Sequence, residues 1–243
     1  MPFTVNGVGT STCGARGFVK WPGLGQADRD ACECFVVLYL PVLPFKPIHA
    51  FDWNGNAYRA IPIRWSMGIF ARVFARAWLG WLPAIAAALL ATFAVVEFNE
   101  RHGPKPMFEY ERAAAALAAA VVAATTFLVL GKMDRRDVAI RRALGRHEFG
   151  SSDPADWIGD LAKAIKPGHE REVGLSYADS ARKALTERQF SRAMWDARLC
   201  CLLEGRSDGE RVTDEILDHP EFQDALFKVG KNGAGWQEAM APA

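Results

Sequence analysis

Two long stretches without formal charge dominate the pattern of hydrophobic and polar positions along this chain. They run from Ala77 to Val96 and from Ala113 to Gly131, and a short charged connection separates them. About twenty apolar residues make a helix that crosses a hydrocarbon core about 30 Å thick. The pattern therefore predicts a transmembrane helical hairpin over residues 77–131.

The second stretch carries the weaker signal, because nine of its nineteen residues are alanine. Its alternative interpretation is a soluble alanine-rich helix. We favour a membrane span, since Ala116, Ala120 and Ala124 form a ridge of small residues that suits close packing of helices. The helix that packs there is either the other span or a second copy of the chain, which would make a homo-oligomer.

Positive residues concentrate on the outer flanks of both stretches, and the connection between them has fewer. Such residues are retained on the cytoplasmic side of a membrane. We therefore expect an integral protein of the inner or plasma membrane with both termini in the cytoplasm. The flanking positive residues are Arg59, Arg64, Arg72, Arg76, Lys132, Arg135, Arg136, Arg141, Arg142 and Arg146.

The remaining sequence divides into segments of different character around the hairpin. The predicted fold class is a mainly α membrane protein with a small β-rich N-terminal module and a small cytoplasmic all-α domain. The segments are a β-rich module at 1–63, an interfacial amphipathic helix at 64–76, a basic juxtamembrane helix at 132–148 that touches anionic lipid headgroups, a cytoplasmic helical domain at 149–229 and a disordered tail at 230–243.

Three prolines interrupt the apolar run of the N-terminal module. Pro41, Pro44 and Pro47 lack the backbone donor that a helix or a central strand needs. The pattern predicts a strand that ends at Leu40, an extended or turning segment, and a second strand near residues 48–53.

The distal part of the chain has helical periodicity and helix-capping residues. Asp153 is a suitable N-cap before Pro154, and a helix is predicted from there to Pro167. Further helices are expected from about Tyr177 to Gln189 and from Ser191 to Glu204, followed by two shorter ones at 213–218 and 221–229.

Trp195 and Arg198 on the third of these helices are residue types enriched in binding hot spots. We favour the plainer alternative, a buried tryptophan beside a surface arginine. Cys200 and Cys201 lie in an apolar context on the same helix and are expected to be packing residues.

Charge is divided unevenly between the two halves, although the net charge is only +1. Residues 1–149 carry 17 basic and 11 acidic side chains, a net of +6, and residues 150–243 carry 12 and 17, a net of −5. An acidic distal half argues against nucleic acid as a partner.

The five cysteines are an odd number, which argues against a disulfide framework. Cys32 and Cys34 are two residues apart, so they face the same side of a strand. Cys13 and His49 could complete with them a tetrahedral zinc site of three thiolates and one imidazole. A thiol-redox pair is a second possibility, and small buried residues of a β core are the interpretation that we favour.

Two groups of residues resemble segments of uncharacterised bacterial multi-span membrane proteins. The first is Thr4-x-Asn6-Gly7-x-Gly9-Thr10 with Cys13-Gly14-x-Arg16 and Glu33-x-Phe35-Val36-x-Leu38-x-x-Pro41-x-x-Pro44-x-Lys46. The second is Gly145-x-His147-Glu148-x-Gly150-Ser151-Ser152-Asp153-Pro154-Ala155-x-Trp157. The resemblance implies a membrane protein and carries no activity with it.

The sequence has no phosphate-binding loop and no nucleophile–histidine–carboxylate signature. We therefore expect a membrane-anchored, non-catalytic interaction or scaffold protein that binds a protein partner. The alternatives are a metal-binding or thiol-redox sensor built on Cys13, Cys32, Cys34 and His49, and a subunit of an oligomeric membrane pore.

Overall fold

A computed structural model gives the fold of the chain. The residues that it describes are 4–5, 8–17, 28–37, 40–54, 57–79, 134–145, 147–158, 161 and 174–225, with scattered positions from 88 to 129. The chain divides into two compact units. Unit 1 comprises Met1–Arg16, Ala31–Pro47 and Trp65–Lys132, and unit 2 comprises Gly17–Asp30, Ile48–Arg64 and Met133–Ala243.

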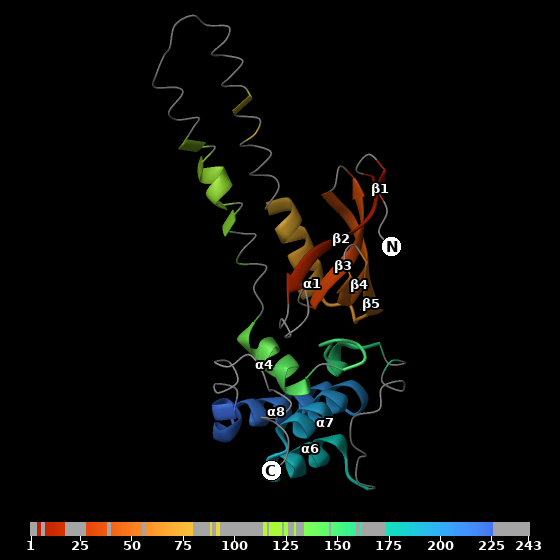
Figure 1. Cartoon of the computed structure of the whole chain (residues 1–243), viewed down its shortest axis with the longest axis vertical. Coiled ribbons are helices and arrows are strands. Elements are labelled where there is room, and N and C mark those ends of the chain that lie inside the picture. Colours follow the sequence, from red (N-terminus) through yellow and green to blue (C-terminus); the bar gives the residue numbers. More distant parts are fainter. Residues whose placement is uncertain are drawn as a thin grey trace, which may run out of the picture. The chain divides into compact units, whose positions relative to one another are not determined.

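Within the described residues, the strands form one sheet whose order follows the chain (Figure 1). The first and last pairs of strands are antiparallel, with Thr4 opposite Gly9 and Ile48 opposite Pro62. The strands are β1 (Thr4–Val5), β2 (Val8–Gly17), β3 (Arg29–Val37), β4 (Leu40–Asn54) and β5 (Ala57–Pro62).

The three prolines do not divide β4, so the segment predicted as extended or turning is extended and no strand ends at Leu40. The strand continues from Leu40 to Asn54. Its register with β5 begins at Ile48, beyond the last proline. The prolines therefore lie outside the β4–β5 ladder, where a missing backbone donor costs no hydrogen bond to β5.

Unit 1 contains a short helix, α1 (Met67–Phe74), followed by a π-helical turn, η1 (Ala75–Leu79). Ser66 caps the start of α1, because its side-chain oxygen accepts from the backbone N–H of Ile69 at 3.2 Å. Val73 is the buried residue of α1 and packs in the core of unit 1. Trp78 of η1 contacts strand β4, because its Nε1 donates to the carbonyl oxygen of Pro41 at 3.0 Å.

Unit 2 is built around α7, which is buried on nearly every side (Figure 1). It packs against α6, α8 and α4. The helices of unit 2 are α4 (Arg135–Leu144), the 3-10 turn η2 (Pro154–Asp156), α6 (Tyr177–Thr186), α7 (Phe190–Leu203), α8 (Arg206–Leu217) and a helical segment at 220–225. The helices predicted after residue 177 agree with these bounds to within a few residues, except that α8 begins seven residues earlier.

Helices α7 and α8 approach each other closely at Gly209. A Cβ there would collide with the sulfur and backbone nitrogen of Cys201. Glycine at this position lets the two helices approach, and Val212 and Ile216 of α8 are fully buried as a result.

The start of the helix predicted from Pro154 to Pro167 is a 3-10 turn over Pro154–Asp156. Asp153 caps it, accepting from the N–H of Ala155 at 2.9 Å. Trp157 then turns to extended backbone and forms a bridge with Ile63, and its indole is closed to solvent. Leu161 is helical, and the other residues from 159 to 167 lie outside the described residues.

The structure contradicts the predicted membrane-spanning hairpin. Among the described residues, no helix has both the length and the apolar character needed to cross a membrane. The longest described helix, α7, has 14 residues and spans about 21 Å, short of the roughly 30 Å of a hydrocarbon core. An uncharged run of sufficient length is a necessary condition for a span and not a sufficient one.

The predicted integral-membrane location, with both termini in the cytoplasm, was built on that hairpin and is contradicted with it. Most residues of the two stretches 77–96 and 113–131 lie outside the described residues, as does the predicted tail at 230–243. The fold of the described residues combines α and β structure.

Candidate functional site

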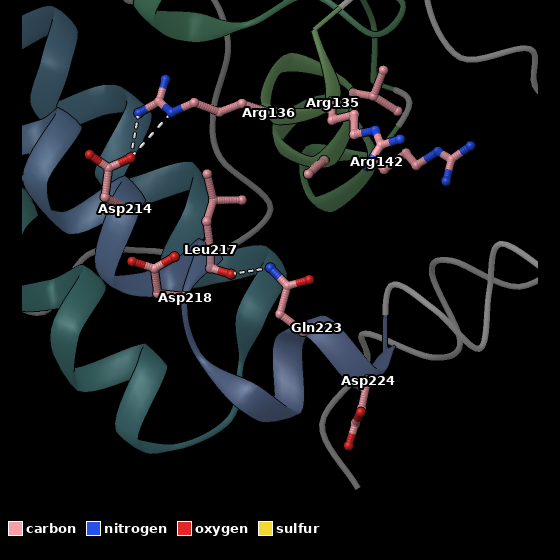
Figure 2. A pocket seen from close by; sticks show the side chains of 10 residues that line it. Arg135, Arg136, Arg142, Asp214, Leu217, Asp218, Gln223 and Asp224 are labelled. Atoms are coloured by element: carbon pink, nitrogen blue, oxygen red, sulfur yellow. Dashed lines mark hydrogen bonds and ion pairs between the residues drawn. The ribbon is translucent and has the colours of Figure 1, made fainter.

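A groove of about 810 Å³ opens in unit 2 between α4 and the C-terminal end of α8 (Figure 2). Three apolar residues, Val138, Ala139 and Leu217, make up what we call its floor, and charged side chains flank them on both sides. The lining residues are Arg135, Arg136, Val138, Ala139, Arg142, Asp214, Leu217, Asp218, Gln223 and Asp224.

The first wall is one face of α4. Arg135, Val138, Ala139 and Arg142 recur at intervals of three and four residues, so they lie along one side of the helix. The other side of α4 supplies Ile140, Ala143 and Leu144 to the core of unit 2. The segment predicted as a basic juxtamembrane helix is thus a packed helix of unit 2, with an exposed basic stripe.

The second wall is acidic and comes from the end of α8 and the helical segment that follows it. Asp214, Leu217 and Asp218 lie within about one turn of α8, and Gln223 and Asp224 follow on the next segment. The amide of Gln223 donates to the carbonyl oxygen of Leu217, which holds the two segments together (Figure 2).

Arg136 fixes the distance between the two walls. Its Nη2 lies 2.7 Å from Glu210 Oε2 and 2.8 Å from Asp214 Oδ1, and its Nε donates to the same Asp214 oxygen at 3.2 Å. Glu210 also accepts from Arg198 at 3.1 Å. These bonds tie α4 to α8 and to the buried α7 behind them.

Three charged side chains of the groove form no ion pair with another described residue. Arg135 on α4 makes no ion pair with another described residue, and the same holds for Asp218 and Asp224 on the opposite wall. All three side chains belong to exposed residues. The groove therefore presents a positive charge on one side of an apolar floor and negative charges on the other.

A second polar cluster in unit 2 is buried. His49 Nδ1 lies 2.7 Å from Asp30 Oδ1, and Arg141 donates from Nη2 to the other oxygen of Asp30 at 3.1 Å. Arg141 also donates from Nη1 to the carbonyl oxygen of Ser151 at 2.7 Å. Because His49 is 0% exposed, this acid–histidine pair lies in the interior of unit 2.

The segment 147–157, which carries part of the sequence resemblance, forms a clasp around this cluster. The N–H of Ser151 donates to Asp28 Oδ2 at 2.8 Å, and the indole of Trp157 donates to the hydroxyl of Ser152 at 3.0 Å. Gly150 has φ +66°, and a Cβ there would lie 2.7 Å from the Cβ of Phe51.

His147 sits in the same clasp between the rings of Trp157 and Trp195, at 5.7 and 5.1 Å between centroids. Its Nε2 lies 2.9 Å from the carbonyl oxygen of Ser152, and its Nδ1 accepts from the N–H of Phe149 at 3.3 Å. One nitrogen donates and the other accepts, which is the pattern of a neutral ring. Burial lowers the pKa of His147 to about 4.

Arg198 is buried, contrary to the prediction of a surface arginine beside a buried Trp195. The side chain of Arg198 binds Asp153 and is 4% exposed. Burial by itself would raise the pKa of Asp153. The charge and hydrogen bonds of Arg198 lower this pKa by more than burial raises it, so the pKa lies below its ordinary value. Cys200 and Cys201 are buried as expected, and burial raises the pKa of each thiol, to about 11 and about 12.

Three of the predicted metal ligands come together in unit 1. Cys32 and Cys34 lie in its core, and Cys13 packs against them. The fourth predicted ligand, His49, belongs to unit 2, where Asp30 engages it.

No group of three or more histidine, cysteine or acidic residues is arranged to hold a metal ion in the part of the chain that the structure describes. Zinc binding by Cys13, Cys32, Cys34 and His49 stays a prediction.

Neither the groove nor the buried cluster had a signal in the sequence. Arg136 and Asp214 are 78 residues apart, and Arg141 and Asp30 are 111 apart. The spacing of Arg135, Val138, Ala139 and Arg142 on one helical face is readable in the sequence, but only the fold shows which surface lies opposite.

No protein-family model, curated protein or solved structure matches the chain significantly.

Proposed function

We propose that the chain is a protein-interaction module whose groove between α4 and α8 binds a short helical segment of a partner. The observation that supports this proposal is the combination of an apolar floor with walls of opposite charge. A helix laid in a groove through its apolar stripe is a recurring mode of peptide recognition.

The composition of the groove favours a peptide over a small molecule. Pockets for small ligands are lined mostly by apolar and aromatic side chains with a few polar groups. Here six of the ten lining residues are charged and three are apolar, namely Val138, Ala139 and Leu217. Charged walls of this kind give specificity and steer the approach of a protein partner.

The chemistry of the occupant follows from the unused charges. Its apolar stripe lies on Val138, Ala139 and Leu217. An acidic side chain on one flank faces Arg135, and a lysine or arginine on the other flank faces Asp218 and Asp224. Figure 2 shows Arg135 and these two acids on different helices around the groove. This arrangement fixes the direction in which the segment lies.

The proposal is tested by selecting binders from a displayed library of helical peptides with the full chain as bait. We expect the selected peptides to have an apolar stripe with acidic residues on one flank and basic residues on the other. Arg135→Glu should weaken these peptides about tenfold, which corresponds to about 1.4 kcal/mol.

The matched control is Arg211→Glu, because Arg211 is an exposed arginine of α8 that does not line the groove. It should leave binding unchanged. A peptide whose acidic flank has been replaced by lysines should bind Arg135→Glu better than the original chain. Selected peptides without charge pattern, or equal losses in the two variants, would overturn the proposal.

A further inference from the structure

Two segments that are 123 residues apart in the chain meet inside unit 2. The N–H of Ser151 donates to Asp28 Oδ2 at 2.8 Å, and the side chains of both residues are closed to solvent. Ser151 belongs to the clasp 147–157, and neither residue lines the groove. What this contact implies therefore does not depend on the proposed function.

Asp28 differs from Asp30, the other buried carboxylate of the same segment. Asp30 Oδ1 lies 2.7 Å from His49 Nδ1, and Asp30 Oδ2 accepts from Arg141 at 3.1 Å, so both of its oxygens are bonded. Asp28 uses only its Oδ2. The Oδ1 of Asp28 is buried and has no hydrogen-bond partner among the described residues, and no described basic residue forms an ion pair with it. A buried acceptor without a donor destabilises the fold.

Ser151 differs from its neighbours in the clasp in the same way. The hydroxyl of Ser152 accepts from the indole of Trp157 at 3.0 Å, and the carboxylate of Asp153 accepts from Arg198 at 3.0 Å. The hydroxyl of Ser151 is buried and has no hydrogen-bond partner among the described residues. The clasp therefore bonds the side chains at 152 and 153 and leaves the one at 151 to another partner.

The two remaining oxygens belong to groups that are already joined. The bond from the Ser151 N–H fixes the carboxylate of Asp28 beside the backbone that carries the Ser151 hydroxyl. The hydroxyl and Asp28 Oδ1 are not hydrogen-bonded to each other. A molecule whose polar atom lies about 2.8 Å from each of them would satisfy both.

The chemistry of the two oxygens restricts which molecule binds there. An ionised carboxylate only accepts hydrogen bonds, so the molecule donates to Asp28, and an anion is excluded. Both side chains are 0% exposed, so the molecule is small. Water meets both conditions, because it donates to a carboxylate and both donates to and accepts from a hydroxyl.

We propose that unit 2 binds an internal water molecule between Asp28 Oδ1 and Ser151 Oγ. The water donates one hydrogen to Asp28 and forms its second bond with the Ser151 hydroxyl. Internal waters of globular proteins typically make about three hydrogen bonds to buried polar groups that lack a protein partner. The water gives the clasp a second attachment to Asp28, beside the one through the backbone N–H.

Magnetic relaxation dispersion of the water oxygen nucleus counts the long-lived waters of the full chain in solution. Ser151→Ala removes one partner of the water and keeps the N–H that binds Asp28, so the count should fall by one. The matched control is Ser207→Ala, because Ser207 is an exposed serine of α8. The control should leave the count unchanged. An unchanged count in Ser151→Ala, or an equal fall in both variants, would overturn the proposal.

A crystal structure of the unmodified chain decides the question even where Ser151→Ala fails to fold. It should place a water oxygen about 2.8 Å from both Asp28 Oδ1 and Ser151 Oγ. Crystals grown with rubidium in place of sodium should show the same weak peak at this position. A stronger peak with rubidium would identify a bound cation and overturn the proposal, as would the absence of any peak between the two oxygens.

Discussion

Inside unit 2, Arg198 Nε donates to both carboxylate oxygens of Asp153, at 3.0 Å to Oδ1 and 3.1 Å to Oδ2. The same aspartate caps η2, so one side chain joins the start of the clasp 147–157 to the centre of α7. Arg198 continues to Glu210, which binds Arg136 at the edge of the groove. A chain of charged hydrogen bonds thus supports the groove from the interior.

Asp153→Asn should destabilise unit 2 by about 3 kcal/mol, because it removes the buried carboxylate that pairs with the Arg198 guanidinium and leaves only the half-buried Glu210 as its counter-charge. Asparagine keeps the capping ability, so the loss reports the ion pair. Urea unfolding followed by tryptophan fluorescence measures it. The control is Glu221→Gln in the exposed pair with Arg188, which should cost less than about 1 kcal/mol. Equal effects of the two changes would contradict the buried pair as a support.

Gly150→Ala should be far more destabilising than Gly145→Ala. Both glycines have positive φ, +66° and +73°, so both changes carry a backbone cost of roughly 1–3 kcal/mol. Nothing lies within 4 Å of a Cβ at Gly145, whereas one at Gly150 would press on Phe51 and Asp28. The difference in unfolding free energy between the variants should therefore be roughly 1–3 kcal/mol. Similar losses of unfolding free energy in the two variants would contradict close packing of Phe51 and Asp28 against residue 150.

Stability should fall as the pH drops from about 6.5 towards 4, because of His147. Its pKa in the fold is about 4, lowered first by burial. Between that value and the ordinary pKa near 6.5, the unfolded chain binds a proton that the folded chain does not, so acidification favours unfolding. The loss is at most about 3 kcal/mol. His147→Gln should flatten this part of a plot of unfolding free energy against pH, and an unchanged slope would contradict a neutral buried ring.

Titration of Asp156 should change the stability with pH in the direction opposite to that of His147. Burial, and then the charge of Asp153, raise its pKa to about 7. The folded chain therefore keeps a proton that the unfolded chain releases near pH 4, and stability declines as the pH rises from about 4 to about 7. The slope should be shallow, because 38% of the side chain is open to solvent. Asp156→Asn should remove this decline, and a steeper decline in the variant would contradict the raised pKa.

The helices after residue 177 were predictable because their periodicity and ends are local properties. Pro154 shows the limit of such reasoning. The cap at Asp153 was readable, but the bridge from Trp157 to Ile63, 94 residues earlier in the chain, makes Trp157 extended, and this contact had no sequence signal. The segment through Pro41, Pro44 and Pro47 could be predicted only as extended or turning, since only the register with β5 shows where donors are needed.

The prediction of a membrane-spanning hairpin was wrong. Its main support was the length of two stretches without charged residues. The groove could not be predicted, since its walls come from residues about 80 positions apart, such as Arg135 and Asp214. The proximity of Cys13, Cys32 and Cys34 followed partly from strand alternation, whereas the separate environment of His49, paired with Asp30, had no sequence signal.

The most direct test of the proposed groove is site-specific photo-crosslinking of a selected helical peptide to the full chain. A benzophenone side chain placed at Ala139, on the floor of the groove, should capture the peptide, and one placed at Arg211 should not. Excess unlabelled peptide should compete with the capture at Ala139. Capture at Arg211 but not at Ala139, or capture at Ala139 that persists in the Arg135→Glu variant at the same peptide concentration, would contradict the assignment of the groove as the binding site.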